Sequence, residues 1–286
     1  MKRDHQHDYE IQGALRCERA LVTLIGDIGP WSDRIVLVGG LAPRYIVGEL
    51  PQGVSEHVGT TDIDLVIGLA IDDAPETYAT LQANLKKSGF SQTSLSYQWE
   101  REVDGVSVKV EFLCETDQVD PGLIYRPKEG TGSKVGAFNV PGAQLTTRDF
   151  VEYELEAERL DDGGRSRITF RVAGVLTCTV LKALAFQDRH DNKDAYDLVF
   201  TLLRHNGGPV GAAEVATVSP VRGDGQVVAA LQLLAERFAE PGLDGPTAYA
   251  NFLADPDDDE EKARLRNEAV AAVAQFIRAL GSMAAN

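Results

Sequence analysis

The segment DIDLVIGL, residues 62–69, places two aspartates at the start of an otherwise apolar run. Successive side chains of a strand point to opposite faces, so Asp62 and Asp64 share one face of a predicted strand. Two carboxylates about 7 Å apart on one face repel each other and resist burial. A divalent cation such as Mg²⁺ would remove this repulsion, because it takes anionic oxygen ligands. The simpler alternative is a polar, solvated strand end.

A second strand is predicted in GVSVKVEFLCE, residues 105–115, where apolar and polar side chains alternate. Glu111 belongs to its polar face. If the two strands are neighbours in one sheet, three carboxylates converge, which is the number expected for one or two Mg²⁺ ions in phosphoryl transfer. An outward glutamate on an amphipathic strand is also ordinary. Asp117, just after this strand, is a second candidate for the same role.

A glycine pair, Gly39 and Gly40, ends the apolar run RIVLVGG, residues 34–40, which is predicted to be a short buried strand. Glycine lets the backbone approach a ligand closely, and the start of a following helix offers unpaired N–H groups to phosphate oxygens. A tight turn explains the pair equally well. A strand, a glycine pair and a second strand that opens with Asp-x-Asp are more specific together than any one of them.

The composition limits the class of protein. The chain has 286 residues with a net charge of −16, 43% hydrophobic and 25% charged residues, which describes a globular protein. This charge is unfavourable for coating nucleic acid, although a local basic groove is still compatible with it. We expect a cytoplasmic protein, because the N-terminus lacks the apolar core of a secretory signal and no apolar run approaches the roughly 18 residues of a membrane span. The cysteines are expected to be buried free thiols; they are Cys17, Cys114 and Cys178.

Strands and helices alternate before about residue 145, and helices predominate after Val175. We therefore expect an α+β protein, with domains at 1–150 and 151–286. The predicted elements of the first part are helices at 9–29 and 75–90, a hairpin that turns at Asp104-Gly105, an edge strand in 136–142, and strands at 150–160 and 165–174. The later helices are predicted at 175–189, 193–205, 225–240 and 260–280. The last of these helices either closes the C-terminal bundle or forms a dimer seam.

Two stretches resemble a known family. VLVGGLAPRYIV (36–47) and GTTDIDLVI (59–67) resemble the signature of the polymerase-β-like nucleotidyltransferases. LKALAFQDRHDNKDAYDLVFTLL (181–203) is similar to the K…R…KDxxDL element of the AbiEii/AbiGii toxin-like nucleotidyltransferases, to which the MenT toxins belong. The resemblance spans roughly residues 34–205. It departs from the family in a longer stretch between Gly40 and Asp62, and in having His57 and Val58 where relatives often carry an arginine.

The resemblance implies a polymerase-β-like mixed sheet flanked by helices and followed by a mainly helical region that completes the active site. It also implies roles for individual residues. The metal, Mg²⁺ or in its place Mn²⁺, would be held by Asp62, Asp64 and Glu111. The nucleotide triphosphate would be contacted by Gly39, Gly40, Thr60, Thr61, Lys182 and Arg189. Asp194 would be a polar active-site residue that the family needs for activity.

Helical spacing supports the later motif independently. Lys182 and Arg189 lie seven residues apart and share a helix face, which suits a triphosphate because lysine provides a point charge and arginine a fork. Asp194 and Asp197 lie in the first turn of the next helix, where acids favour the positive end of the macrodipole. We expect Asp197 to be structural and to pair with Arg189 or Lys193.

The activity implied by the resemblance is transfer of a nucleoside monophosphate from an NTP to an acceptor hydroxyl, with release of pyrophosphate. Glu111 or Asp194 would help to deprotonate the acceptor. MenT-like relatives act on tRNA 3′ ends and related toxins belong to toxin–antitoxin pairs, so tRNA and a cognate antitoxin are the expected partners. One alternative is a nucleotidyltransferase that modifies a small molecule, such as an antibiotic or a metabolite. Another is a catalytically idle nucleotide-binding scaffold.

Overall fold

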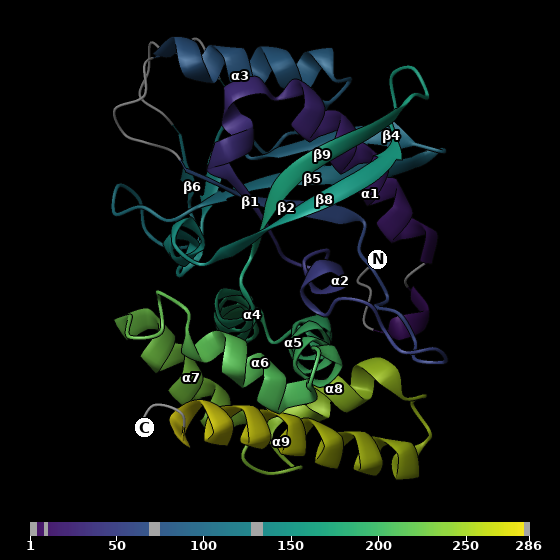
Figure 1. Ribbon diagram of the computed structural model, residues 1–286, viewed down its shortest axis with the longest axis vertical. Helices are drawn as coiled ribbons and strands as arrows, with labels where there is room; N and C mark the ends of the chain where they lie inside the picture. Colours follow the sequence, from purple (N-terminus) through teal and green to yellow (C-terminus); the bar gives the residue numbers. More distant parts are fainter. Residues whose placement is uncertain (1–4, 9–10, 69–74, 127–133, 283–286) are drawn as a thin grey trace. The chain divides into compact units, whose positions relative to one another are not determined.

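The computed structural model describes residues 5–8, 11–68, 75–126 and 134–282. Within these residues the chain is α+β, with an open, mixed sheet of nine strands flanked by helices and a helical C-terminal part (Figure 1). Seven strands follow the order β3-β4-β5-β2-β1-β9-β8, and β7 pairs with both β5 and β6. The predicted α+β class and the mixed sheet are confirmed.

The chain forms two compact units that are interleaved along the sequence. The sheet unit comprises Ile11–Leu41 and Gly59–Ala173. The helical unit comprises Met1–Glu10, Ala42–Val58 and Gly174–Asn286. A short segment from the first part of the sequence therefore belongs with the C-terminal helices. The division into domains at residue 150 stays a prediction.

The strands of the sheet unit are β1 (Ile35–Val38), β2 (Asp62–Ile67), β3 (Ser91–Gln92), β4 (Gln98–Val103), β5 (Val106–Cys114), β6 (Ile124–Tyr125), β7 (Ala137–Asn139), β8 (Phe150–Glu158) and β9 (Arg165–Ala173). β1 runs antiparallel to β2 and parallel to β9, and β2 runs parallel to β5. The hairpin β4–β5 turns at Asp104 and Gly105, as predicted. Both residues have positive φ, 52° and 76°, which is the backbone that a two-residue hairpin turn requires.

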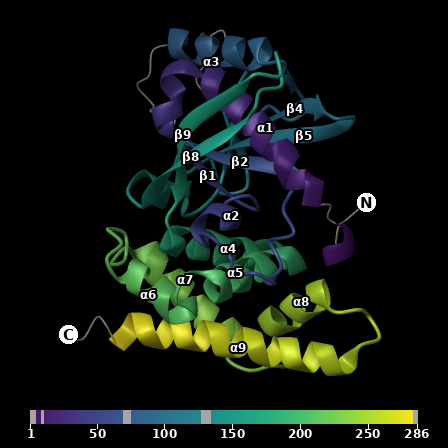
Figure 2. The ribbon, with the colours of Figure 1, turned by 45° about the vertical axis from the view of Figure 1, so that its right-hand side comes forward.

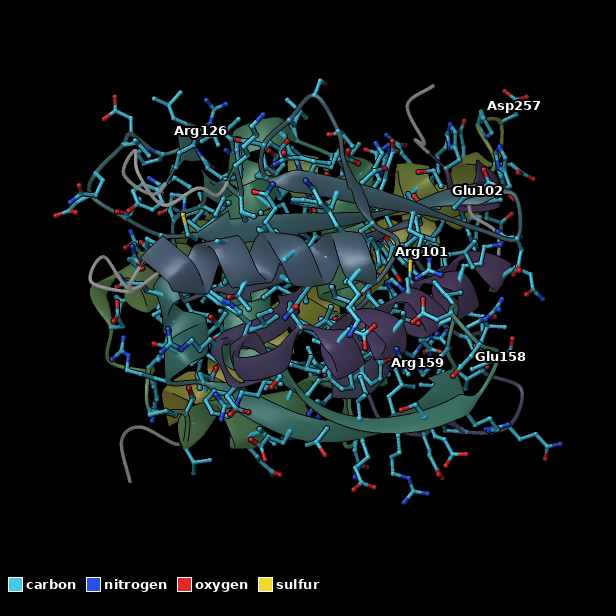
Figure 3. All side chains as sticks on the ribbon, turned by 90° about the horizontal axis from the view of Figure 1, so that it is seen from above. Arg101, Glu102, Arg126, Glu158, Arg159 and Asp257 are labelled. Atoms are coloured by element: carbon cyan, nitrogen blue, oxygen red, sulfur yellow. The ribbon has the colours of Figure 1, made fainter. Side chains whose placement is uncertain are left out.

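Two helices pack on one face of this sheet, α1 (Ile11–Asp27) and α3 (Pro75–Lys87). Figure 2 shows α3 at the top of the sheet unit and α1 running obliquely along the strands, and Figure 3, seen from above, shows the two helices side by side in front of the strands. Their inward side chains are fully buried, among them Leu21, Leu24, Leu81 and Leu85. The apolar side chains of β2 and β5 that alternate with the polar ones supply the other half of this core, which explains why the two strands carry alternating patterns.

Two arginines labelled in Figure 3 attach the helices to the strands. Arg101 of β4 donates to the carbonyl oxygen of Ser88, just after α3, and to Asp161 at 2.9 Å. Arg159, just after β8, donates to Asp27 at the end of α1 and to Asp161, at 2.9 and 2.8 Å. These pairs fix the ends of both helices on the same face of the sheet.

The prediction of a strand in 136–142 is confirmed by β7, but its expected place at an edge of the sheet was wrong. β7 has partners on both sides, because it runs parallel to β5 and antiparallel to β6. β6 has only two residues, Ile124 and Tyr125, within a turn-rich stretch, and a strand this short carries no periodic pattern. The segment η3 (Ala143–Thr147) follows β7, and η2 (Gly29–Arg34) precedes β1.

The helical unit contains α4 (Val175–Arg189), α5 (Asn192–Arg204), α6 (Gly208–Thr217), α7 (Gly225–Arg237), α8 (Asp244–Leu253) and α9 (Asp259–Ser282), together with α2 (Pro43–Ile46) and η1 (Gln6–Asp8). α9 packs against α6 and α8 and so closes the helical bundle. This was one of the two alternatives predicted for the last helix. α6 and α8 were missed because the first turn of each contains a Gly-Pro pair, which is typical of a loop. In both helices the proline occupies the first turn, where its missing N–H costs nothing. None of the described helices is long and apolar enough to cross a membrane.

Candidate functional site

Asp64 and Glu111 are direct neighbours on adjacent strands. β2 and β5 are parallel partners, with Asp64 opposite Glu111 and Asp62 opposite Lys109. Side chains opposite each other in a sheet point to the same face, so these four residues share one face. Ile63, between the two aspartates, is completely buried on the other face. The two strands are therefore neighbours in one sheet, which was the condition for the three acids to converge.

Gly39 leaves the space that the Asp64 carboxylate occupies. Val38, the last residue of β1, lies opposite Asp64, and the chain then turns at Gly39 with φ +68°. A Cβ atom on residue 39 would lie 1.8 Å from Asp64 Oδ2, far inside van der Waals contact. Gly39 therefore serves a tight turn and a close approach at once. Gly40 continues this turn. The helix that follows, α2, has only four residues.

Glu111 is held by a side chain from the neighbouring hairpin strand. Gln98 Nε2 donates to Glu111 Oε1 at 2.6 Å. Gln98 is buried and lies directly opposite Glu111 in the register of β4 and β5. The pKa of Tyr97 is raised, first by burial and then by the charges of Glu111 and Asp64. Sequence reasoning missed both residues, although counting outward from the turn at Asp104-Gly105 pairs Gln98 with Glu111.

Thr60 and Thr61 hold the start of β2. Thr60 Oγ1 accepts a hydrogen bond from the backbone N–H of Asp62 at 3.2 Å, and Thr61 O accepts one from the backbone N–H of Lys109 at 3.3 Å. Cys17 Sγ lies 3.5 Å from Thr60 O and donates to it. The side chain of Lys109 shares the face of the two aspartates, and sequence reasoning did not single it out as a site residue. The alternation in VSVKVEF was the signal that could have found it.

The three acids offer Mg²⁺ the kind of ligand it takes, hard carboxylate oxygens. As they lie, however, no three His, Cys, Asp or Glu side chains of the described residues are close enough together to hold a metal ion. Asp64 and Glu111 form a neighbouring pair, and Asp62 is the next residue on the same face of β2. The donors fit a divalent cation in chemistry and in strand position, and the binding of one metal ion by all three carboxylates stays a prediction. Asp117 lies past the end of β5 and lines a pocket with Glu115.

The other predicted site residues belong to the helical unit, where Asp194 joins two cations. Lys182 Nζ lies 3.0 Å from Asp194 Oδ1, and Arg189 donates to Asp194 from Nε at 2.6 Å and from Nη2 at 2.7 Å. The Lys182 side chain is only 8% exposed, whereas that of Arg189 is 59% exposed. Burial alone would raise the pKa of Asp194, but the charges of Lys182 and Arg189 lower it. Asp194 is therefore a poor proton acceptor.

Asp197 is the centre of a buried ionic network. Lys182 Nζ lies 2.6 Å from Asp197 Oδ2, and Lys193 Nζ lies 2.8 Å from Asp197 Oδ1. The prediction that Asp197 pairs with Lys193 is confirmed. Burial alone would raise the pKa of Asp197, but the two lysines, together with a bond from His57, lower it. Burial likewise opposes the charge of Lys182, yet Asp197 and Asp194 raise the pKa of its ammonium above the ordinary value. The pKa of Lys193 is lowered, first by its burial, although the charge of Asp197 opposes this shift.

His57 fastens the segment 42–58 to α5. Its Nε2 lies 2.8 Å from Asp197 Oδ1, and its ring packs 5.2 Å from the Tyr196 ring and 5.0 Å from the Phe200 ring. The backbone N–H of Val58 donates to the Tyr196 hydroxyl at 3.2 Å. Burial lowers the pKa of His57 to about 4, so the ring is neutral at pH 7 and donates its Nε2–H to the carboxylate. Sequence reasoning noted His57 only as a departure from the family pattern.

The three cysteines are free and buried, as predicted. His190 is exposed and ends α4 with φ 50°. Comparisons of the chain with protein-family models, with curated proteins and with solved structures found no match.

Proposed function

We propose that this chain is a Mg²⁺-dependent nucleotidyltransferase with a polymerase-β-like sheet, and that it moves a nucleoside monophosphate from an NTP to an acceptor hydroxyl. The observation that best supports the proposal is the pairing of Asp64 with Glu111 on parallel neighbouring strands, with Gly39 shaped to the Asp64 carboxylate. Like charges placed side by side on a sheet are unfavourable unless a cation compensates them. The sequence motifs that resemble those of nucleotidyltransferases indicate which reaction such a metal site would serve.

In this proposal Asp62, Asp64 and Glu111 hold Mg²⁺ or Mn²⁺. When bound, the metal lowers the cost of negative charge on the attacking and leaving oxygens. Gln98 orients Glu111 through its 2.6 Å hydrogen bond. Of the two predicted bases, Glu111 is the better candidate, because the cations beside Asp194 lower the pKa of that carboxyl and weaken it as a base.

The residues proposed to contact the nucleotide are Gly39, Gly40, Thr60, Thr61, Lys182 and Arg189. The exposed guanidinium of Arg189 suits a phosphate better than the buried ammonium of Lys182, which two carboxylates already neutralise. We therefore propose that Lys182 acts mainly by holding Asp194 and Asp197 in place. Lys109, on the same face as Asp62, is a further candidate for a phosphate contact.

The acceptor has two proposed classes. The resemblance favours a tRNA 3′ end, with this chain as the toxin of a toxin–antitoxin pair and a cognate antitoxin as its partner. The alternative is a small molecule with a hydroxyl group, and the acidic pocket beside the carboxylates, described below, favours it.

The test is transfer of label from each of the four NTPs, labelled on the α-phosphate, in the presence of Mg²⁺ or Mn²⁺. Total tRNA and a panel of small hydroxyl compounds serve as acceptors, and pyrophosphate release is measured in parallel. We expect metal-dependent labelling that is lost in Asp62→Asn/Asp64→Asn. The matched control is Glu152→Gln/Glu154→Gln, which also neutralises two acids two residues apart on one strand, β8.

Persistent transfer in the Asp62→Asn/Asp64→Asn protein would overturn the proposal. So would the absence of pyrophosphate release with every acceptor, which is the behaviour expected of an idle nucleotide-binding scaffold. A metal-dependent rise in melting temperature with NTP, without turnover, would identify that scaffold directly.

A further inference from the structure

A pocket of about 790 Å³ lies within the sheet unit at the ends of β2 and β5. This volume is in the range of sites that hold small ligands, roughly 300–1,000 Å³. The described residues that line it are Val66, Ile67, Gly68, Cys114, Glu115, Thr116, Asp117, Tyr125, Gln144 and Thr147.

The pocket begins one step along the sheet from the carboxylate pair. Val66 follows Asp64 by two residues on the same face of β2, a rise of about 7 Å. Val66 also lies opposite Leu113, which follows Glu111 by two residues on β5. The lining also includes Ile67 and Cys114, which belong to the opposite face, so the pocket lies across the ends of the two strands, close to the carboxylate pair.

The polar groups in the pocket are complementary to amines and hydroxyls. Glu115 and Asp117 contribute negative charge, and Thr116, Thr147 and Tyr125 contribute hydroxyls. No Lys, Arg or His is among the described residues of the lining. Phosphate groups require such cations, so the lining is unfavourable for a polyanion and favourable for a cationic ligand.

A buried amide fixes the loop that carries these groups. Asn139 is only 2% exposed, and its Oδ1 accepts from the backbone N–H of Thr116 at 3.0 Å. Its Nδ2 donates to the carbonyl oxygens of Thr116 and Val119, at 2.9 and 2.7 Å. Glu115 Oε2 accepts from the backbone N–H of Gln144 at 2.9 Å. The acidic lining is therefore held in place before any ligand arrives, which lowers the entropy cost of binding.

We propose that this pocket binds a small molecule that carries both amino and hydroxyl groups, with the amino group at Glu115 and Asp117. That this molecule is the acceptor of the transfer rests on the proposed function. One of its hydroxyl oxygens would then form a bond to the α-phosphorus of the NTP as the bond to the bridging oxygen breaks. Pyrophosphate leaves with the electron pair, and the hydroxyl proton passes to Glu111.

The binding test uses three probes of similar size and different charge: glucosamine, glucose and glucose 6-phosphate, measured by ligand-observed NMR without NTP or metal. We expect glucosamine to bind roughly tenfold more tightly than glucose, because one hydrogen bond between charged groups lowers the dissociation constant by about a factor of ten. Glucose 6-phosphate should not compete. Asp117→Asn should weaken glucosamine binding by roughly the same factor. Asp120→Asn, an exposed acid of the same loop outside the lining, is the matched control and should change it less than twofold.

Equal binding of the three probes, no binding at all, or the same effect in Asp117→Asn and Asp120→Asn would overturn the pocket assignment. Binding should persist in Asp62→Asn/Asp64→Asn, which separates the pocket from the transfer chemistry. If transfer occurs but only tRNA is labelled, and Asp117→Asn labels it normally, the role of the pocket in holding the acceptor is wrong while the proposed function stands.

Discussion

Gly39 and Asp64 occupy adjoining space, with the position of a Cβ atom on residue 39 only 1.8 Å from Asp64 Oδ2. Residue 39 also has φ +68°, where L side chains are strained. The glycine thus determines where one carboxylate of the proposed metal site can lie. Any side chain at this position has to displace that carboxylate.

We expect Gly39→Ala to destabilise the protein by about 1–3 kcal/mol beyond the strain of its backbone, which is the usual cost of overpacking. The control is Gly105→Ala, because Gly105 has φ +76° and nothing within 4 Å of its Cβ position. Urea unfolding of both variants isolates the collision with Asp64 from the strain of positive φ. Equal losses of unfolding free energy in the two variants would show that the close approach to Asp64 is absent.

The buried position of Lys182 between Asp194 and Asp197 predicts a large effect of its removal. Lys182→Met should lower the free energy of unfolding by about 3–5 kcal/mol, because it leaves buried carboxylates with fewer cations. Arg167→Met on β9 removes a cation from an exposed ion pair with Glu156 and should leave the denaturation midpoint almost unchanged. A Lys182→Met protein as stable as the Arg167→Met protein would contradict the buried network.

His57 predicts a specific dependence of stability on pH. Its pKa is about 4 in the folded protein and about 6.5 in an unfolded chain, so the unfolded state binds the extra proton between these values. The stabilisation that comes from the lowered pKa of His57 is complete above pH 6.5 and is lost as the pH falls to 4. This loss lowers the free energy of unfolding by about 3 kcal/mol. The lowered pKa values of Asp194 and Asp197 change the free energy of unfolding mainly below pH 4.

The check is the unfolding free energy of the wild-type protein and of His57→Gln, measured at intervals from pH 4 to 7. The difference in unfolding free energy between the wild-type protein and His57→Gln should become smaller as the pH falls, because the glutamine amide donates to Asp197 and does not titrate. A constant difference across this range would mean that His57 is not held neutral by burial.

The cysteine thiols should be inert in the folded protein. Burial, followed by the charges of Asp62 and Asp64, raises the pKa of Cys17, and burial together with Glu115 raises that of Cys114 to about 12. Thiolate is the reactive form, so a disulfide reagent at pH 8 should label the native protein very slowly. It should label three thiols per chain in guanidinium chloride. Rapid labelling of the native chain would show that these segments are open to solvent.

Local patterns predicted much of the sheet unit. The alternation in β2 and β5 fixes which side chains share a face, and the turn at Asp104-Gly105 fixes the register of the hairpin. They did not predict that β2 and β5 are neighbours, which brings Asp62, Asp64 and Glu111 to one face. They also could not predict how the Glu111 carboxylate is oriented, because this depends on its rotamer and on the hydrogen bond from Gln98.

Contacts between residues distant in the sequence were invisible to the same reasoning. His57 and Asp197 are 140 residues apart, and nothing local indicates that they meet. The interpretation of Lys182 as part of an open cationic stripe rested on helical spacing, which identifies a face but not what covers it. The pocket escaped notice for a similar reason, since its lining is assembled from several separate loops and strand ends.

The interleaving of the two units along the sequence limits how much of the chain can fold while the ribosome is still synthesising it. Residues 42–58 are made early, but the helix that receives His57 and Val58 is synthesised more than a hundred residues later. Residues 42–58 therefore cannot form their contacts with α5 until this helix has left the exit tunnel of the ribosome. For the same reason no single cut in the backbone yields two intact units, and deleting the C-terminal helices would leave His57 and Val58 without the helix that they contact.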